Sequence, residues 1–152
     1  MGQDMSIWRA PLGRMGQDMS MASIEPELWV EGAAGAVTFY ETALGADTLR
    51  RVGDGDDLVV QLQVGEARFW IVSANSEMRR FSPNDIGGRT SRTPLIVEDP
   101  DAATARAVSA GATEITPVGD DDEHGWRIGR IIDPYGHEWE IGRPLGDWPP
   151  NR

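Results

Sequence analysis

The feature that most constrains how this chain can fold is an internal repeat. The segment LWVEGAAGAVTFYETALGA, which begins at Leu28, aligns with LIVEDPDAATARAVSAGA, which begins at Leu95. The two segments share a Leu-x-Val-Glu start and a Gly-Ala end. Self-similarity of this kind indicates two copies of one supersecondary unit, each of which buries its apolar face only with help from its neighbour. The sequence therefore predicts a tandem pair.

A short strand followed by a helix is predicted at the start of each copy. Apolar residues recur at three- and four-residue steps in the first copy, at Ala36, Phe39, Tyr40, Ala43 and Leu44. In the second copy Asp99 is suited to cap the helix, and Pro100 is suited to its first position, where a missing N–H costs nothing. Gly45 and Gly111 can take the left-handed conformation that ends a helix.

Alternating residues beyond each helix predict strands. Val60, Leu62 and Val64 would share one face of a strand, and Phe69 and Ile71 one face of the next. In the second copy, residues 129–132 lead into the turn sequence Asp-Pro-Tyr-Gly at 133–136, and residues 137–141 return as a last strand. The acidic Asp54, Asp56 and Asp57 fit a hairpin turn better than an ion site.

These elements predict an α+β fold with two βαβββ modules. Their sheets would curve side by side into an incomplete barrel with a concave cleft. One domain over 24–145 is expected, made of modules 24–75 and 92–145 and joined by a loop rich in Ser, Asn, Gly and Arg, or a flap, at 75–92. Because MGQDMS occurs at 1–6 and again at 15–20, residues 1–23 are interpreted as a disordered tail or cloning remnant, with a native start near Met15 or Met21. Residues 146–152 are interpreted as a second tail.

Composition excludes several classes of partner. The chain of 152 residues has a net charge of −11, which argues against nucleic acid because phosphate binding needs a basic face. The charge suits solubility or a cationic ligand. No apolar run approaches the ~18 residues that span a bilayer, so no membrane partner is expected. The absence of cysteine excludes disulfides and thiolate chemistry, and it fits a cytoplasmic protein.

Two stretches resemble the vicinal oxygen chelate superfamily, which includes glyoxalase I, bleomycin resistance proteins and extradiol dioxygenases. They are the first repeat segment and GWRIGRIIDPYGHEWEI at 125–141, and the closing stretch is most similar to the PhnB-like branch. The resemblance implies a glyoxalase/bleomycin resistance-like fold and a homodimer. It leaves open whether each cleft is formed within one chain or between two.

The resemblance also implies where a metal would bind. Members that use a divalent metal take ligands from the first and last strands of each module. Those positions are occupied here by Glu25, Trp70, Pro94 and Glu140. Proline has no side-chain donor atom, and the indole N–H offers no lone pair. His124 falls in an acidic loop, and His137 would point away from Glu140. No metal cofactor is therefore expected, and the alternative is a divalent metal held by Glu25 and Glu140.

Strand alternation predicts which side chains line the cleft. If Leu28, Val30, Phe69, Ile71, Trp139 and Ile141 face the helices, the opposite face carries Trp29, Glu31, Val59, Gln61, Gln63, Arg68, Trp70, Val72, Glu138 and Glu140. The glycine-rich strand leaves the orientation of Arg127 open. Aromatic, amide and carboxylate groups together are typical of an organic-ligand pocket. The predicted ligand-binding residues are Glu140, Trp29, Trp70, Arg68, Gln61 and Arg127.

Three functions fit these residues. The preferred hypothesis is a protein that binds a small molecule, cationic or aromatic, without turnover, as the resemblance to bleomycin resistance proteins implies. The alternative is a metal-dependent lyase, isomerase or dioxygenase of the same superfamily that uses Glu140 and Glu25. A homodimeric scaffold with a vestigial cleft is the third. The sequence does not identify the ligand, because a fold hosts many chemistries.

Overall fold

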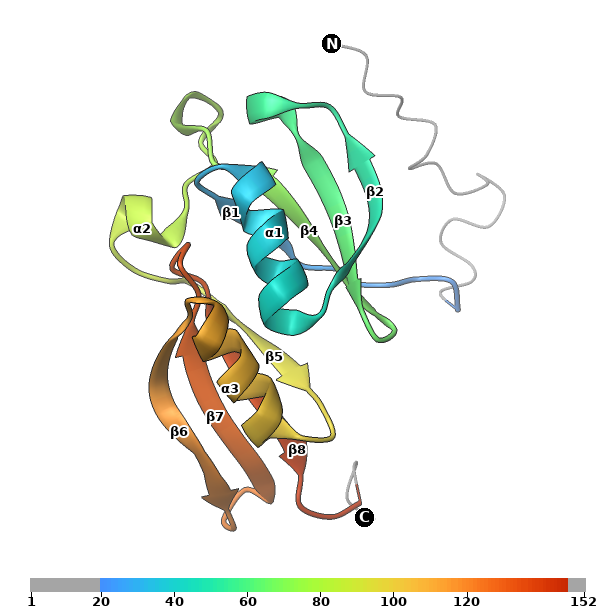
Figure 1. Cartoon of the computed structure of the whole chain (residues 1–152), viewed down its shortest axis with the longest axis vertical. Coiled ribbons are helices and arrows are strands. Elements are labelled where there is room, and N and C mark those ends of the chain that lie inside the picture. Colours follow the sequence, from blue (N-terminus) through green and yellow to red (C-terminus); the bar gives the residue numbers. More distant parts are fainter. Residues whose placement is uncertain (1–19, 148–152) are drawn as a thin grey trace.

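The computed structural model describes residues 20–147, and the two expected tails lie largely outside them (Figure 1). The first module consists of β1 (Glu27–Val30), α1 (Ala33–Leu44), β2 (Asp47–Val52), β3 (Val59–Val64) and β4 (Ala67–Ser73). The second consists of β5 (Arg92–Ile96), α3 (Pro100–Ala110), β6 (Thr113–Asp121), β7 (Trp126–Ile132) and β8 (Glu138–Pro144). The predicted pair of βαβββ units is confirmed.

Each module forms one mixed four-stranded sheet. The strand orders are β1-β4-β3-β2 and β5-β8-β7-β6, and in both sheets the first strand of the module pairs in parallel with its last strand. The other neighbours are antiparallel hairpin partners. The predicted hairpin turn at the acidic cluster is a short 3-10 turn over Gly55–Asp57 between β2 and β3. Within residues 20–147, no helix has the length and apolar character needed to cross a bilayer.

The two long helices begin and end as their sequences predict. The Asp99 carboxylate caps α3 by accepting a hydrogen bond from the Ala102 N–H at 3.0 Å, and Pro100 follows as the first helical residue. Gly45 ends α1 with a φ of 67°, in the left-handed region that a glycine enters without steric cost. Gly111 ends α3, also with a positive φ.

The core lies between the helices and one face of each sheet (Figure 1). The predicted inward set is confirmed, because each of its six members is buried: Leu28, Val30, Phe69, Ile71, Trp139 and Ile141. Helices α1 and α3 also pack against each other, so that the two modules share one apolar interior. The alternate residues of each strand therefore lie on the face opposite the helices.

The linker between the modules contains more structure than the predicted loop. Residues 75–92 include a 3-10 turn at Ser76–Met78 and a short helix α2 at Pro83–Ile86. Ser82 and Asp85 form a reciprocal capping box, which satisfies backbone N–H groups at the start of α2. The Asn84 amide donates to the Pro134 carbonyl oxygen at 3.3 Å, so the linker also contacts the Asp-Pro-Tyr-Gly turn. The capping signal was present in the sequence, but a four-residue helix has too little apolar periodicity to be recognised.

A buried carboxylate joins the two modules. Asp133, 3% exposed, accepts hydrogen bonds from the Tyr40 hydroxyl of α1 and from Trp139 Nε1 of β8, the latter at 3.0 Å. Its other oxygen accepts from the backbone N–H groups of Tyr135 and His137 at 2.9 and 3.0 Å. These five residues are called the Asp133 junction below. Because Tyr40 belongs to the first module and Asp133 to the second, the junction holds the two repeats together.

Replacing Tyr40 by phenylalanine tests the junction. Burial, reinforced by the Asp133 carboxylate, raises the pKa of Tyr40 well above its ordinary value of 10.0. A raised pKa means that the neutral phenol is favoured in the folded state, so its stabilisation is present below pH 10 and is lost at higher pH. We expect Tyr40→Phe to lower the free energy of unfolding by about 1–2 kcal/mol at pH 7. Urea titrations at pH 7 and 10.5 should show a smaller alkaline loss in the variant, and equal losses would contradict the assignment.

Candidate functional site

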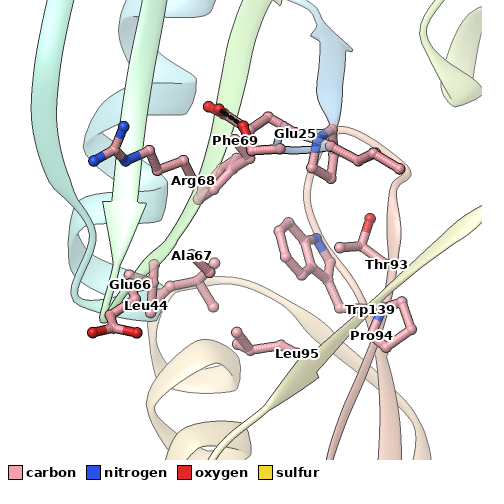
Figure 2. A pocket seen from close by; sticks show the side chains of 14 residues that line it. Glu25, Leu44, Glu66, Ala67, Arg68, Phe69, Thr93, Pro94, Leu95 and Trp139 are labelled. Carbon is pink, nitrogen blue, oxygen red and sulfur yellow. Dashed lines mark hydrogen bonds between the residues drawn. The ribbon is translucent and has the colours of Figure 1, made fainter. Parts of the chain in front are cut away.

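A crevice of about 380 Å³ separates the two modules at one edge. The first module contributes the end of α1, the β3–β4 turn and the start of β4, and the second contributes β5 and Trp139 (Figure 2). The apolar wall consists of Leu44, Val64, Phe69, Leu95 and Trp139. Glu25 and Arg68 lie together at one end of this wall, and Glu66 lies at the turn. The crevice has the size and the largely apolar lining of a small-molecule site.

Three side-chain hydrogen bonds hold the Glu25 carboxylate in place at the crevice. One of its oxygens accepts from Gln61 Nε2 at 2.7 Å and from Trp70 Nε1 at 3.2 Å, and the other accepts from the Ser23 hydroxyl at 2.7 Å. The Ser23 hydrogen bond is the largest influence on the pKa of Glu25; with the Gln61 and Trp70 donors and the charge of Arg68, it lowers the pKa against the opposing effect of partial burial. Glu25 is therefore ionised at neutral pH.

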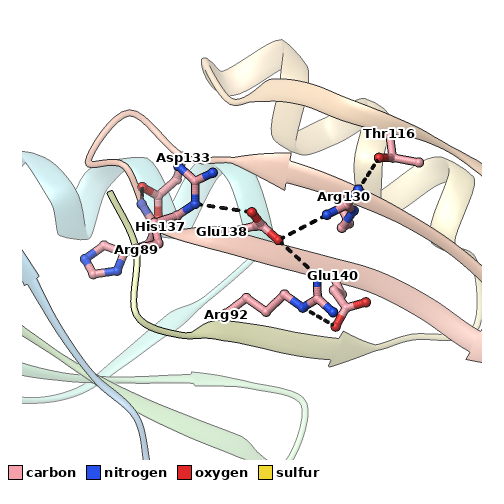
Figure 3. Close-up of polar contacts among 8 residues, drawn as sticks. All are labelled: Arg89, Arg92, Thr116, Arg130, Asp133, His137, Glu138 and Glu140. Carbon is pink, nitrogen blue, oxygen red and sulfur yellow. Dashed lines mark hydrogen bonds and ion pairs between the residues drawn. The ribbon is translucent and has the colours of Figure 1, made fainter. Parts of the chain in front are cut away.

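A second polar cluster lies on the face of the β5–β8 sheet opposite the helices (Figure 3). Glu138 of β8 pairs with Arg89 at 3.2 Å, Arg92 at 3.4 Å and Arg130 at 3.6 Å. Arg92 also pairs with Glu140 at 3.0 Å. These five residues are called the arginine cluster below. With three guanidinium groups and two carboxylates, the arginine cluster itself has one net positive charge.

The structure places the predicted cleft residues in three hollows. Glu25 and Arg68 line the crevice, whereas Glu140 lines a groove of about 340 Å³ on the face of the second sheet. Trp29 lines a third hollow beside the linker, where its Nε1 donates to Glu27 at 2.8 Å. Gln61 and Trp70 meet at Glu25, as described above. The single hollow expected from the sequence is therefore divided within one chain.

Arg127 lies on the other side of its sheet. In the β7–β8 register it is opposite Arg143, and it shares its face with the buried Ile131. Its guanidinium pairs with Asp101 of α3 and Asp120 of β6, at 2.8 and 2.9 Å. Strand alternation and the contact with a helix both place Arg127 away from the cleft face, so this part of the expected lining was wrong. Gly129 lies in the middle of β7, so no apolar side chain at that position indicated which residues of the strand face the helices.

The residues present do not fit the metal that the fold family implies. Trp70 uses its indole N–H to donate to Glu25, and Pro94 has no donor atom. The remaining two positions line different hollows, and Glu140 is paired with Arg92. Within residues 20–147 no group of three or more His, Asp or Glu side chains is arranged to hold a metal ion. A divalent ion would have to displace these hydrogen bonds and the ion pair.

The sequence reasoning missed the arginines. It placed Glu138 and Glu140 on the cleft face but not their partners Arg92 and Arg130. In the strand register Arg92 lies opposite Glu138 and Arg130 lies opposite Glu140. Residues that lie opposite each other point to the same face of a sheet, so extending the alternation to β5 and β7 would have placed both arginines on the face opposite the helices. Arg89 could not have been found in this way, because it belongs to the irregular linker.

Two βαβββ modules joined through their helices, with hollows between and beside the sheets, have the architecture of a glyoxalase/bleomycin resistance-like protein. Comparison with known proteins agrees with this class. The Glyoxalase-like domain family matches residues 27–142. The chain belongs to this family.

The chain is similar in sequence to known relatives and in fold to solved structures. The uncharacterized protein Mb0911c of Mycobacterium bovis is 33% identical over 129 residues, which cover 81% of this chain and 84% of that protein. The structure of the Arabidopsis thaliana gene product At5g48480 is similar with a TM-score of 0.64 and 27% identity, covering 80% of this chain and 98% of that one. FosX from Listeria monocytogenes, a fosfomycin resistance protein determined with Mn(II) and 1S,2S-dihydroxypropylphosphonic acid, has a TM-score of 0.63 at 14% identity, covering 84% and 92%. The FosX likeness concerns the fold alone.

Proposed function

We propose that this protein binds a small organic cation with an aromatic or apolar body in the crevice between its modules, without turnover and without a metal. One observation carries the proposal. Glu25 is an ionised carboxylate at the end of an apolar crevice, and within the described residues it has no ion-pair partner within 4.0 Å. A carboxylate held by neutral donors keeps its negative charge available to a ligand.

The rest of the crevice favours the same kind of ligand. Its charged residues are Glu25, Glu66 and Arg68, so its lining carries one net negative charge. Phe69 and Trp139 line the crevice from the buried core, so they add apolar contact for the body of a ligand. The net charge of −11 on the whole chain also attracts cations at long range.

Several finer features belong to the same proposal. The closing motif at 125–141 supports a place in the PhnB-like branch, and the absence of cysteine supports a cytoplasmic location. The match to the glyoxalase-like family supports a homodimer, which the resemblance to this superfamily implies. Sedimentation equilibrium would test the dimer independently of any ligand. A sedimenting mass of 16.6 kDa, that of one chain, would contradict it.

A matched pair of probes tests the binding site. N-methylacridinium carries a permanent positive charge, and acridine has nearly the same shape but is neutral at pH 7.5. We expect isothermal titration calorimetry to show one site for N-methylacridinium, with about tenfold weaker binding of acridine. Glu25→Gln should reduce the affinity for the cation to that for acridine. Glu41→Gln, which removes an exposed carboxylate on α1 away from the crevice, is the control and should change neither affinity.

The pH dependence provides a second readout. Since the pKa of Glu25 lies below its ordinary value of 4.5, the carboxylate stays charged as the pH falls from 7 to 5, and the affinity for N-methylacridinium should be constant over that range. It should fall only below pH 4.5, while the protein is still folded by circular dichroism. Equal binding of the two probes, or a stoichiometric metal in protein purified without a tag, would contradict the proposal.

A further inference from the structure

The two oxygen atoms of the Glu25 carboxylate have different surroundings. Oε1 accepts the hydrogen bonds from both Gln61 Nε2 and Trp70 Nε1. These two donors belong to β3 and β4 of the first sheet, where they lie opposite each other in the strand register. Oε2 accepts from the hydroxyl of Ser23, a residue that itself lines the crevice. Oε1 therefore faces the sheet, and Oε2 faces the crevice.

These contacts limit what the carboxylate can still accept. A carboxylate oxygen accepts about two hydrogen bonds, so Oε1 is saturated, and Ser23 occupies one position on Oε2. Arg68 lies at the same end of the crevice, but its Nε donates to Gln63 Oε1 at 3.3 Å (Figure 2). Glu25 can therefore hold a ligand through a single N–H group on Oε2. It cannot offer both oxygens to the parallel N–H groups of a guanidinium or amidinium.

The apolar wall of the crevice favours the same kind of cation. Its leucine, valine, phenylalanine and tryptophan side chains contain no hydrogen-bond acceptor, and the Trp139 indole N–H is directed to Asp133. An additional N–H group of a ligand that faces this wall would stay without an acceptor, which weakens binding. N-alkyl groups in the same place would instead bury apolar surface against the wall.

We propose that the crevice is selective for protonated tertiary amines, and that Gln61 and Trp70 determine this selectivity by saturating Oε1 of Glu25. The inference rests on the proposed cation site and narrows its ligand class. A protonated tertiary amine has one N–H group for Oε2 and apolar N-alkyl groups for the wall. Amidinium and guanidinium ions have more N–H groups than the site can satisfy, and a quaternary ammonium has none, so both bind more weakly.

Three ligands with the same naphthalene body and one positive charge at pH 7 test this selectivity in calorimetric titrations of the full chain. N,N-dimethyl-(2-naphthylmethyl)amine is protonated and has one N–H group, 2-naphthamidine has parallel N–H groups, and trimethyl-(2-naphthylmethyl)ammonium has none. We expect the tertiary amine to bind about tenfold more tightly than either of the others. Glu25→Gln should remove this preference, because it removes the charged acceptor.

Two variants test the residues that saturate Oε1. Gln61→Met and Trp70→Phe each remove one donor and keep most of the apolar bulk of the side chain. Either change frees a position on Oε1, so the amidine can engage both oxygens, and we expect it to bind about as tightly as the tertiary amine. Gln63→Met is the matched control on the same strand, because the Gln63 amide donates to the Gly65 carbonyl oxygen at 2.7 Å and not to Glu25. This control should keep the tenfold preference of the unmodified chain.

The outcomes separate the selectivity from the cation site itself. If the amidine or the quaternary ammonium binds the unmodified chain as tightly as the tertiary amine, the selectivity is overturned and the cation site stands. An unchanged ratio of amine to amidine affinity in either Oε1 variant that folds would also overturn it. Absence of binding by all three ligands and by N-methylacridinium would overturn the cation site as well.

Discussion

Replacement of Asp133 by asparagine is expected to lower the free energy of unfolding by about 3 kcal/mol. Four donors converge on this carboxylate, and it is 3% exposed. Asparagine has nearly the same shape, but its NH₂ group would face the Tyr40 hydroxyl and the Trp139 indole N–H, two groups that now donate. The variant therefore leaves buried donors without an acceptor, which costs more than the loss of a surface hydrogen bond.

Urea unfolding followed by circular dichroism at pH 7 measures this effect. Asp47→Asn is the matched control, since Asp47 is exposed on β2, and its replacement should change the free energy of unfolding by less than about 0.5 kcal/mol. A change at Asp133 as small as that at Asp47 would mean that the junction does not hold the modules together. Tyr40→Phe should have a smaller effect than Asp133→Asn, because it removes one donor and leaves the carboxylate with three.

Trp139→Ala is expected to lower the free energy of unfolding by about 3–5 kcal/mol. The indole is 3% exposed and packs against the rings of Tyr40 and Phe69, with centroids 5.9 and 5.6 Å away. Alanine would leave a cavity and remove one of the donors to Asp133. Trp139→Phe should retain much of the packing but lose the hydrogen bond, so its cost should lie between that of alanine and zero.

Val108→Ala serves as the comparison for Trp139→Ala. Val108 is 39% exposed on α3, and its truncation should change the free energy of unfolding by less than about 0.5 kcal/mol. Because Trp139 and Asp133 are hydrogen-bonded, the double variant Asp133→Asn/Trp139→Phe should cost less than the sum of the two single changes, with a difference of about 0.5–3 kcal/mol. Strict additivity in the measured unfolding energies would contradict a direct interaction.

The fold could be predicted because its signals are local. Strand alternation correctly assigned Leu28 and Ile71 to the core, and the Asp99-Pro100 pair correctly marked the start of α3. Each of these signals depends on residues within a few positions of each other, so one sequence is enough to read them. The internal repeat then predicted the same order of elements in the second module as in the first.

The site was predicted less completely because it depends on residues far apart in the chain. Asp133 was recognised only as a turn residue, since nothing in its own segment points to a hydroxyl on α1. Glu140 was placed on the correct face, but the sequence did not show that Arg92 would neutralise it or that Glu25 would line another hollow. These arrangements follow from how two curved sheets meet, which strand periodicity does not encode.

The Asp133 junction has a consequence for the evolution of the repeat. The helix alignment that superposes Gly45 on Gly111 puts Arg106 at the place of Tyr40, and Arg106 instead donates to the Thr42 carbonyl oxygen at 2.8 Å. The first half therefore contributes the Tyr40 hydroxyl and the second half the Arg106 guanidinium to the contacts between them, so the two halves are not interchangeable. Two copies of the first half would contain neither Asp133 nor Arg106 and would lack both contacts, and two copies of the second half would lack Tyr40. The two modules have the same strand order, but the contacts that join them are not related by the repeat.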